Sequence, residues 1–440
     1  MRDLTALWRE QGARGIAYRA SYEMVRALEP PAPAAEPRRL LNDSHSYHVA
    51  ASPFYSPTSS ELAANEEVVA AFEDRPRTVK TATWFVPWFD NILFGGINTI
   101  FRFIDWMRAE HGVEPRVVLY DHPALTDELV RAPIVEAFPA LADIDIVLPP
   151  AGVAPYVDFD ELPPTDIAVA TIWYSAYALL RYNSAAAKFY FVQDFEPAFY
   201  PASSLWGQAE ATYRLGFGGL VNTPALADRY RSYGNPAVGF IPALDPRAAF
   251  VDPERKVHPG PVTVVLYGRP GTGRNGFELL GSASKLLKRR YGDGIRVVSA
   301  GEDFDPADYG LDAVVENVGL LRTREEIDAL YAGADIGLYC MFTHHPSYQP
   351  LEYFAAGVAV VTNVNPATSW LLRHEENCLL AEPSSETLAE AVGRLVEDRE
   401  LRVKLATRGQ ELVRSFDWHE QFRVMWEFIT NAPPSAGGAT

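Results

Sequence analysis

Two arginines in the C-terminal half have the spacing that phosphate chemistry needs. Arg269 and Arg274 lie in VTVVLYGRPGTGRNG (residues 262–276), between a β-branched run and a helical one. Two guanidinium groups on one strand-to-helix loop can converge on a single pyrophosphate through bidentate, charge-assisted hydrogen bonds. Such cations stabilise the negative charge that develops on a leaving phosphate. The pair therefore predicts a site for a nucleoside diphosphate, with two solvated loop arginines as the alternative.

The same loop also contains a literal G-x-G-x-x-G, formed by Gly271, Gly273 and Gly276. This pattern is the dinucleotide fingerprint, in which glycines let backbone N–H groups approach a pyrophosphate at a helix N-terminus. An NAD site also expects an acidic residue about 20 residues further on. Glu302 and Asp303 follow the next strand, slightly late, and the loop is strongly cationic. An NAD-dependent oxidoreductase therefore stays open as an alternative to a transferase.

A third set of candidates lies in the segment YQPLEYFAAG, which starts at Tyr348. A proline near a helix start and a carboxylate in the first turn suit a helix N-terminus that faces a cleft. Glu352 could there accept hydrogen bonds from ribose hydroxyls. A solvated N-terminal glutamate is the structural alternative.

The N-terminal half adds two polar segments that follow predicted strands. FGGINT (residues 94–99) has two glycines that allow close backbone approach to a ligand, and Asn98 can cap the helix that follows. QDFEP (residues 193–197) places Gln193, Asp194 and Glu196 at a strand end, which suits hydrogen bonding to sugar hydroxyls. A tight turn and an ordinary strand-to-loop cap are the respective alternatives.

The composition is that of a globular enzyme and argues against nucleic acid as a partner. The chain has 440 residues, 48% hydrophobic, with 39 Lys and Arg against 57 Asp and Glu, a net charge of −18. Binding a polyanion needs a basic footprint that this balance lacks. The two cysteines suggest a reduced pair, the polar first residues do not look like a signal peptide, and no apolar run reaches about 18 residues. We expect a cytoplasmic protein with at most a peripheral contact at the inner face of the membrane.

Several acidic and histidine pairs mimic metal sites without a complete ligand set. The D-x-D pairs at residues 143–145, 158–160 and 303–305 have no second group of ligands nearby in the sequence. His344 and His345 are adjacent, but no further His or Cys has zinc-ligand spacing. His122 is a lone histidine after a predicted strand. We therefore predict no metal.

Strands and helices alternate through both halves, which is typical of parallel sheets covered on both faces. The predicted strands are 81–89, 115–121, 143–150, 166–177, 188–195 and 218–223, then 262–268, 295–301, 313–319, 335–341 and 358–363. Residues 1–30 predict an amphipathic helix, and a proline-rich, charged stretch near 245–260 predicts a linker. The sequence thus predicts an α/β fold of two facing, doubly wound Rossmann-like domains with a ligand cleft between them. Their expected bounds are 1–248 and 249–415, with 416–440 forming a crossover helix on the first domain and a disordered tail.

Residues 261–420 resemble the nucleotide-binding domain of the retaining GT-B glycosyltransferases of the GT4 family. The matching segments are VLYGRPGTGRNGFELL, VENVGLLRTREEIDALYAGADIGLY and PLEYFAAGVAVVTN, followed by FDWHEQF near the crossover helix. More narrowly, HPSYQPLEYFAAG and FYFVQDFEPAFYP resemble the WsaF-type rhamnosyltransferases of bacterial surface-glycan assembly.

The resemblance implies a role for each candidate. An Arg and a basic residue five positions later hold the donor pyrophosphate in GT4, and the second Glu of an E-x7-E motif binds the ribose, here Glu352. The first Glu falls on His344, a departure that leaves the donor-sugar contact to His344, His345 or Tyr348. The expected catalytic residues are Gln193, Asp194 and His344; the donor-binding residues are Gly95, Gly96, Arg269, Arg274, Leu320, Tyr348, Pro350, Leu351 and Glu352; the acceptor-binding residues are Asn98 and Glu196.

The resemblance further implies transfer of L-rhamnose from dTDP-L-rhamnose, or of another sugar from its nucleotide, to a glycan or lipid-linked glycan acceptor. Retention of configuration, no metal and no cofactor are expected. Because no carboxylate nucleophile is evident, front-face transfer is the working hypothesis. Three alternatives remain: a nucleotide-sugar epimerase with the GT-B fold, an NAD-dependent oxidoreductase, and a non-catalytic glycan-binding protein, prompted by His344.

Overall fold

A computed structural model describes residues 52–70, 77–89, 91–92, 95–120, 126–148, 159, 161–256 and 260–431. The helix predicted for residues 1–30, His122, the D-x-D at 158–160 and the tail after residue 431 lie outside these residues. The chain divides into two compact units, Met1–Ser56 and Pro57–Thr440, and the second contains both sheets.

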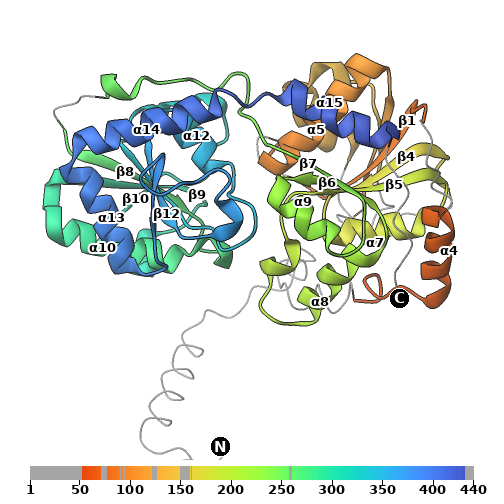
Figure 1. Cartoon of the computed structure of the whole chain (residues 1–440), viewed down its shortest axis with the longest axis horizontal. Coiled ribbons are helices and arrows are strands. Elements are labelled where there is room, and N and C mark those ends of the chain that lie inside the picture. Colours follow the sequence, from red (N-terminus) through yellow and green to blue (C-terminus); the bar gives the residue numbers. More distant parts are fainter. Residues whose placement is uncertain are drawn as a thin grey trace, which may run out of the picture. The chain divides into compact units, whose positions relative to one another are not determined.

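The N-terminal half of the second unit forms a parallel seven-stranded sheet with the order β3-β2-β1-β4-β5-β6-β7 (Figure 1). Its strands are β1 Thr81–Val86, β2 Glu114–Leu119, β3 Asp145–Val147, β4 Thr165–Ala170, β5 Ala185–Val192, β6 Gly218–Asn222 and β7 Ala237–Phe240. The strand order reverses between β1 and β4, which makes their carboxyl ends a topological switch point.

The C-terminal half forms a parallel six-stranded sheet with the order β10-β9-β8-β11-β12-β13. Its strands are β8 Val262–Gly268, β9 Ile295–Gly301, β10 Glu316–Asn317, β11 Ile336–Leu338, β12 Ala359–Asn363 and β13 Cys378–Ala381. The same Rossmann order puts a second switch point between β8 and β11. The predicted pair of doubly wound parallel α/β domains is therefore confirmed.

Helices cover both faces of each sheet because successive strand residues point to opposite sides. Val264 and Leu266 of β8 pack into one layer and Val265 into the other. The helices are α4 Ser59–Ala70, α5 Gly95–His111, α6 Asp127–Ala137, α7 Trp173–Arg181, α8 Ser204–Ala211, α9 Pro224–Arg231, α10 Phe277–Tyr291, α11 Arg324–Ala332, α12 Gln349–Ala355, α13 Ser385–Glu397, α14 Arg399–Val413 and α15 Trp418–Asn431.

The last described helix belongs to the core of the N-terminal sheet. Trp418, Phe422, Met425 and Ile429 of α15 are buried in the same cluster as Phe103 of α5. The helix α15 contacts both α5 and β7. An amphipathic helix at the end of the chain thus covers apolar surface of the first sheet.

The structure differs from the predicted secondary structure at several points. The strand predicted for 166–177 ends at Ala170, and α7 begins at Trp173 because the Ser175 hydroxyl accepts hydrogen bonds from the N–H groups of Thr171 and Ile172. The helix cap predicted at Asn98 was also wrong, because α5 already starts at Gly95 and Asn98 lies in its first turn. The strands β7 and β13 were not predicted, since each has only four residues.

No helix in the described part of the chain has the length and apolar character needed to cross a membrane. Cys340 and Cys378 are both free and buried.

Candidate active site

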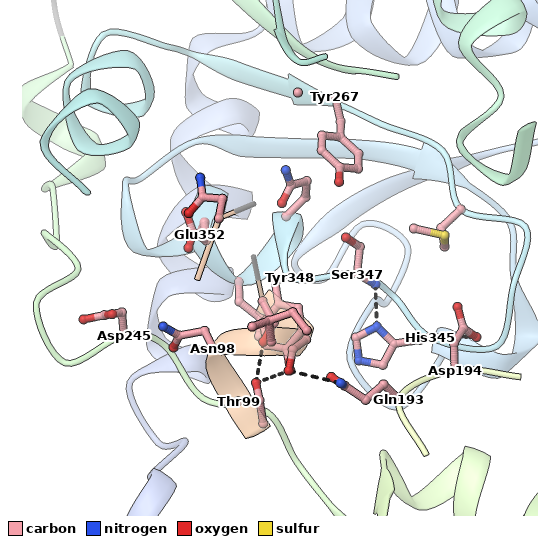
Figure 2. A pocket seen from close by; sticks show the side chains of 18 of the residues that line it. Asn98, Thr99, Gln193, Asp194, Asp245, Tyr267, His345, Ser347, Tyr348 and Glu352 are labelled. Atoms are coloured by element: carbon pink, nitrogen blue, oxygen red, sulfur yellow. Dashed lines mark hydrogen bonds between the residues drawn. The ribbon is translucent and has the colours of Figure 1, made fainter. Parts of the chain in front are cut away.

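A cavity of about 410 Å³ lies at the carboxyl ends of both sheets, where the two switch points meet (Figure 2). Thr171 and Ile172 after β4 and Arg269 after β8 line it, as do residues that follow β5 and β11. Ligands of doubly wound proteins bind at this edge of the sheet. The topology therefore makes the cavity the candidate active site.

Most of the predicted site residues meet in this cavity. Those that line it are Gly95, Gly96, Asn98, Gln193, Asp194, Glu196, Arg269, Arg274, Leu320, Tyr348, Leu351 and Glu352. Pro350 is buried in the first turn of α12. His344 packs edge-on against Phe195, at 5.1 Å between ring centroids, and it is His345 that lines the cavity.

The two loop arginines face the cavity without carboxylate partners. Among the described residues, neither Arg269 nor Arg274 forms an ion pair. Arg269 donates a hydrogen bond to the Tyr267 hydroxyl at 3.2 Å, and the guanidinium of Arg274 stacks on Phe199 at 4.2 Å from the ring centroid. Burial lowers the pKa of Arg274, and the nearby Asp194 carboxylate opposes that shift. Two oriented cations that face a cavity without a direct ion pair among the described residues make a strong anion site.

The glycine-rich loop is built differently from a dinucleotide loop. Gly273–Asn275 form a 3₁₀ turn before α10, and Gly276 has φ +57°, where a side chain would collide with Phe342. The Glu302 carboxylate accepts a hydrogen bond from the Gly271 N–H at 3.3 Å. A carboxylate against the loop repels a pyrophosphate at that position. The geometry thus favours Arg269 and Arg274 over the glycine N–H groups as the anion site.

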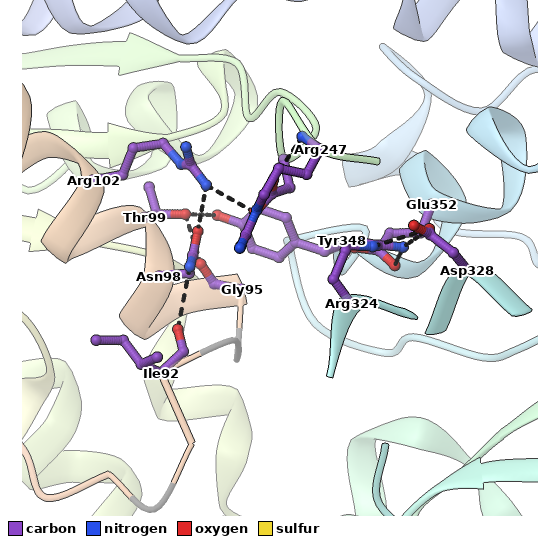
Figure 3. Close-up of polar contacts among 11 residues, drawn as sticks. Ile92, Gly95, Asn98, Thr99, Arg102, Arg247, Arg324, Asp328, Tyr348 and Glu352 are labelled. Atoms are coloured by element: carbon purple, nitrogen blue, oxygen red, sulfur yellow. Dashed lines mark hydrogen bonds and ion pairs between the residues drawn. The ribbon is translucent and has the colours of Figure 1, made fainter. Parts of the chain in front are cut away.

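Glu352 lies in the first turn of α12 and forms an ion pair with Arg324, which sequence reasoning missed (Figure 3). The Nη1 atom of Arg324 is 2.9 Å from Oε1, and Nη2 is 3.3 Å from Oε2. Burial raises the pKa of Glu352, and the guanidinium opposes this shift. Both side chains line the cavity. The spacing of 28 residues between them gave no sequence pattern that could have identified the pair.

Tyr348 joins the two halves of the site. Its hydroxyl is 2.7 Å from the Thr99 hydroxyl and accepts a hydrogen bond from the Asn222 amide at 3.1 Å. Its ring lies directly against Gly95, where any side chain would overlap it. Burial raises the pKa of Tyr348 to about 12, so the hydroxyl stays neutral. Gly95 is thus required for packing against Tyr348.

The Asp194 carboxylate accepts four hydrogen bonds, three of them from the loop that follows β11. The donors are the Thr343 hydroxyl and the N–H groups of Phe195, His344 and His345. Burial raises its pKa to about 6, and the hydrogen bonds oppose that shift. Asp194 therefore positions the loop of residues 343–345 at the cavity.

Next to Asp194, Glu196 is a buried carboxyl on the cavity wall. Its Oε2 accepts hydrogen bonds from the Trp173 N–H and from the Tyr190 hydroxyl, the latter at 2.7 Å. Burial raises its pKa to about 8, so the group holds its proton at neutral pH. Gln193 donates from Nε2 to the Gly96 carbonyl at 3.0 Å, and a side chain at Gly96 would press on the end of the Gln193 side chain.

Asn98 and the two histidines have structural partners. Asn98 accepts a hydrogen bond from Arg102 at 3.0 Å and donates to the Ile92 carbonyl at 3.3 Å. The Nδ1 of His345 accepts from the Ser347 N–H at 3.0 Å (Figure 2). Burial lowers the pKa of His345 to about 3, which keeps the ring neutral. Within the described ranges, no three His, Cys, Asp or Glu residues cluster closely enough to hold a metal ion.

Two family matches identify the chain. Residues 86–218 match the N-terminal domain of WsaF and residues 262–393 match its C-terminal domain, which together cover more than half of the chain. The chain belongs to the WsaF family. The first matched segment contains β2 to β5 of the N-terminal sheet, and the second contains all six strands of the C-terminal sheet.

Two curated proteins are similar to this WsaF-family chain. The O-antigen biosynthesis protein RfbC of Myxococcus xanthus is 42% identical over 388 residues, which are 87% of the chain and 29% of RfbC. The lipopolysaccharide core biosynthesis glycosyltransferase LpsE of Rhizobium meliloti (strain 1021) is 27% identical over 206 residues, 44% of the chain and 57% of LpsE. The chain thus spans less than two thirds of the length of either relative.

Solved structures show the GT-B fold. The HepE protein of Anabaena, crystallised with UDP and glucose, superposes with a TM-score of 0.60 and 15% identity, covering 80% of the chain and 99% of HepE. The WsaF-family chain therefore has the GT-B fold.

Proposed function

We propose that the chain is a glycosyltransferase that moves a sugar from a nucleoside diphosphate to a glycan acceptor during assembly of a bacterial surface polysaccharide. The main support for this proposal is the pair Arg269 and Arg274. Both line the cavity, and neither forms an ion pair among the described residues. Glu352 lies in the same cavity, where it can accept hydrogen bonds from ribose hydroxyls. Family membership and the names of RfbC and LpsE support the polysaccharide role.

The finer proposal is that the donor is dTDP-L-rhamnose and that the acceptor is a glycan or lipid-linked glycan. The resemblance to WsaF-type rhamnosyltransferases supports this choice. Where the wider family has a glutamate for the donor sugar, this chain has His344, which is packed against Phe195. The donor sugar therefore meets neutral groups of His345 and Tyr348 at that side of the cavity.

In the proposed reaction the acceptor hydroxyl attacks the anomeric carbon on the face that the nucleotide leaves. The bond from that carbon to the β-phosphate oxygen breaks, the new glycosidic bond forms, and the hydroxyl proton passes to the departing phosphate oxygen. The anomeric configuration is retained. Arg269 and Arg274 stabilise the charge on the leaving pyrophosphate without a metal or a cofactor. The direct contacts of Asp194 and Tyr348 across the cavity help to exclude water from it.

A thermal-shift panel with dTDP, UDP and NAD tests this proposal. A ligand at about 100 times its Kd stabilises a protein by about 2.7 kcal/mol. We expect dTDP or UDP to raise the Tm by several degrees and NAD to leave it unchanged. A shift with NAD but with neither diphosphate would reject the transferase in favour of an oxidoreductase.

A further inference from the structure

The Arg324–Glu352 pair on the cavity wall has properties that fold stability alone does not explain. Arg324 is the first residue of α11, where the positive end of the helix dipole disfavours a cation. Its side chain is only 10% exposed. A residue chosen for helix stability at this position would be acidic. The position therefore points to a requirement that comes from the cavity.

Arg324 uses most of its donors on two carboxylates (Figure 3). Nε and Nη2 donate to Oδ1 of Asp328 at 2.9 and 2.6 Å, while Nη1 and Nη2 donate to the two oxygens of Glu352. A guanidinium has five N–H groups. These contacts use four of them, and within the described part of the chain the fifth, on Nη1, has no partner.

The ion pair fixes the orientation of the Glu352 carboxylate but uses only part of its capacity to accept hydrogen bonds. Each carboxylate oxygen has two lone pairs, and each accepts one hydrogen bond from Arg324. One lone pair on each oxygen remains for a ligand hydroxyl. Arg324 also supplies a positive charge, which opposes the rise in the pKa of Glu352 that burial causes. Without Arg324, Glu352 would lose both its fixed orientation and the positive charge that opposes the rise in its pKa.

We infer that Arg324 is a positioning residue, which holds the Glu352 carboxylate in the orientation in which it accepts a hydrogen bond from the 3′-hydroxyl of the donor nucleotide. The inference rests on the proposed function, since it requires a nucleoside diphosphate in this cavity. A hydroxyl that donates to a fixed carboxylate is expected to contribute about tenfold or more to the affinity.

Calorimetric titration with dTDP and UDP, each paired with its 3′-deoxy analogue, tests the inference. The wild-type chain should bind the 3′-deoxy analogue about tenfold more weakly. In Arg324→Gln the ratio of the two Kd values, that of the 3′-deoxy analogue to that of the parent diphosphate, should fall below about threefold. The parent diphosphate should still bind through Arg269 and Arg274. Glu352→Gln should show the same small ratio, and the double variant should show no further loss, because the two residues act as one unit.

Two other variants control for effects on folding. Arg324→Lys keeps the charge but not the two-pronged geometry, and its ratio should also fall. Arg296→Gln removes an exposed ion pair with Glu316, at 2.7 Å on the same sheet, and should keep the wild-type ratio. If the wild type binds neither diphosphate, the proposed function fails with the inference. Two results would overturn the inference alone. In the first, the wild type binds the diphosphates and their 3′-deoxy analogues equally well. In the second, the wild type prefers the parent diphosphates, and Arg324→Gln and Arg324→Lys keep that preference.

Discussion

Replacing Arg274 with alanine should weaken nucleotide binding strongly, because this side chain is held in place before any ligand arrives. Its guanidinium lies 4.2 Å from the centre of the Phe199 ring, and no ion pair among the described residues competes for it. A pre-oriented cation loses little conformational freedom when it binds a phosphate. The truncation therefore removes a ligand contact without breaking a direct ion pair among the described residues.

The size of the effect follows from the type of hydrogen bond that is lost. A hydrogen bond to a charged group is worth about 1.5–3 kcal/mol, which corresponds to a weakening of Kd by about ten- to a hundredfold. Arg290 offers a matched control, since it is exposed and pairs with Glu397 at 2.7 Å. Arg290→Ala should change Kd by less than about twofold.

The assay is calorimetric titration of dTDP and UDP into the wild type and both variants at low and high salt. Because the lost contact is electrostatic, Arg274→Ala should also show a smaller salt dependence of Kd than the wild type. The reasoning would be refuted by an Arg274→Ala variant that folds normally and binds the diphosphate with unchanged affinity.

Three further substitutions test other parts of the site. Gly95→Ala should displace the Tyr348 ring and lower the free energy of unfolding by about 1–3 kcal/mol, measured by urea denaturation; an unchanged value would contradict the packing described. Because burial raises the pKa of Glu196 to about 8, the folded chain holds a proton that the unfolded carboxyl releases above about pH 4.5, so stability falls as the pH rises towards 8. Relative to Glu196→Gln, the wild type should lose about 2 kcal/mol between about pH 6 and pH 7.5 in guanidinium titrations, and parallel curves would argue against a buried proton. Asp194→Ala removes the acceptor for the Thr343 hydroxyl and should reduce the transfer rate by at least about tenfold with dTDP affinity nearly unchanged, whereas full activity would reject its positioning role.

The sequence predicted the fold well because strand and helix periodicities are local properties. Runs such as VVLY and AVATI are apolar on both faces and could be assigned to buried parallel strands from composition alone. The end of β4 at Ala170 could not, since it depends on the Ser175 hydroxyl, which caps two backbone N–H groups. The strands β7 and β13 have only four residues each and need tertiary context to be recognised.

The site was predictable where a short loop carries the chemistry and unpredictable where distant residues meet. Arg269 and Arg274 were identified from spacing within one loop. Arg324 was missed because its partner Glu352 is 28 residues away. The orientation of His344 away from the cavity was also missed, because the backbone N–H groups of His344 and His345 bind Asp194, a residue 150 positions earlier in the chain.

The proposed transfer itself is tested most directly by incubating the chain with dTDP-L-rhamnose and a surface-glycan acceptor, followed by mass spectrometry and linkage analysis of the product. We predict that the acceptor gains one deoxyhexose in the retained configuration, that dTDP is released, and that the Arg269→Ala/Arg274→Ala double variant abolishes both. Transfer that persists in the Arg269→Ala/Arg274→Ala double variant would contradict the central claim that this arginine pair holds the leaving diphosphate.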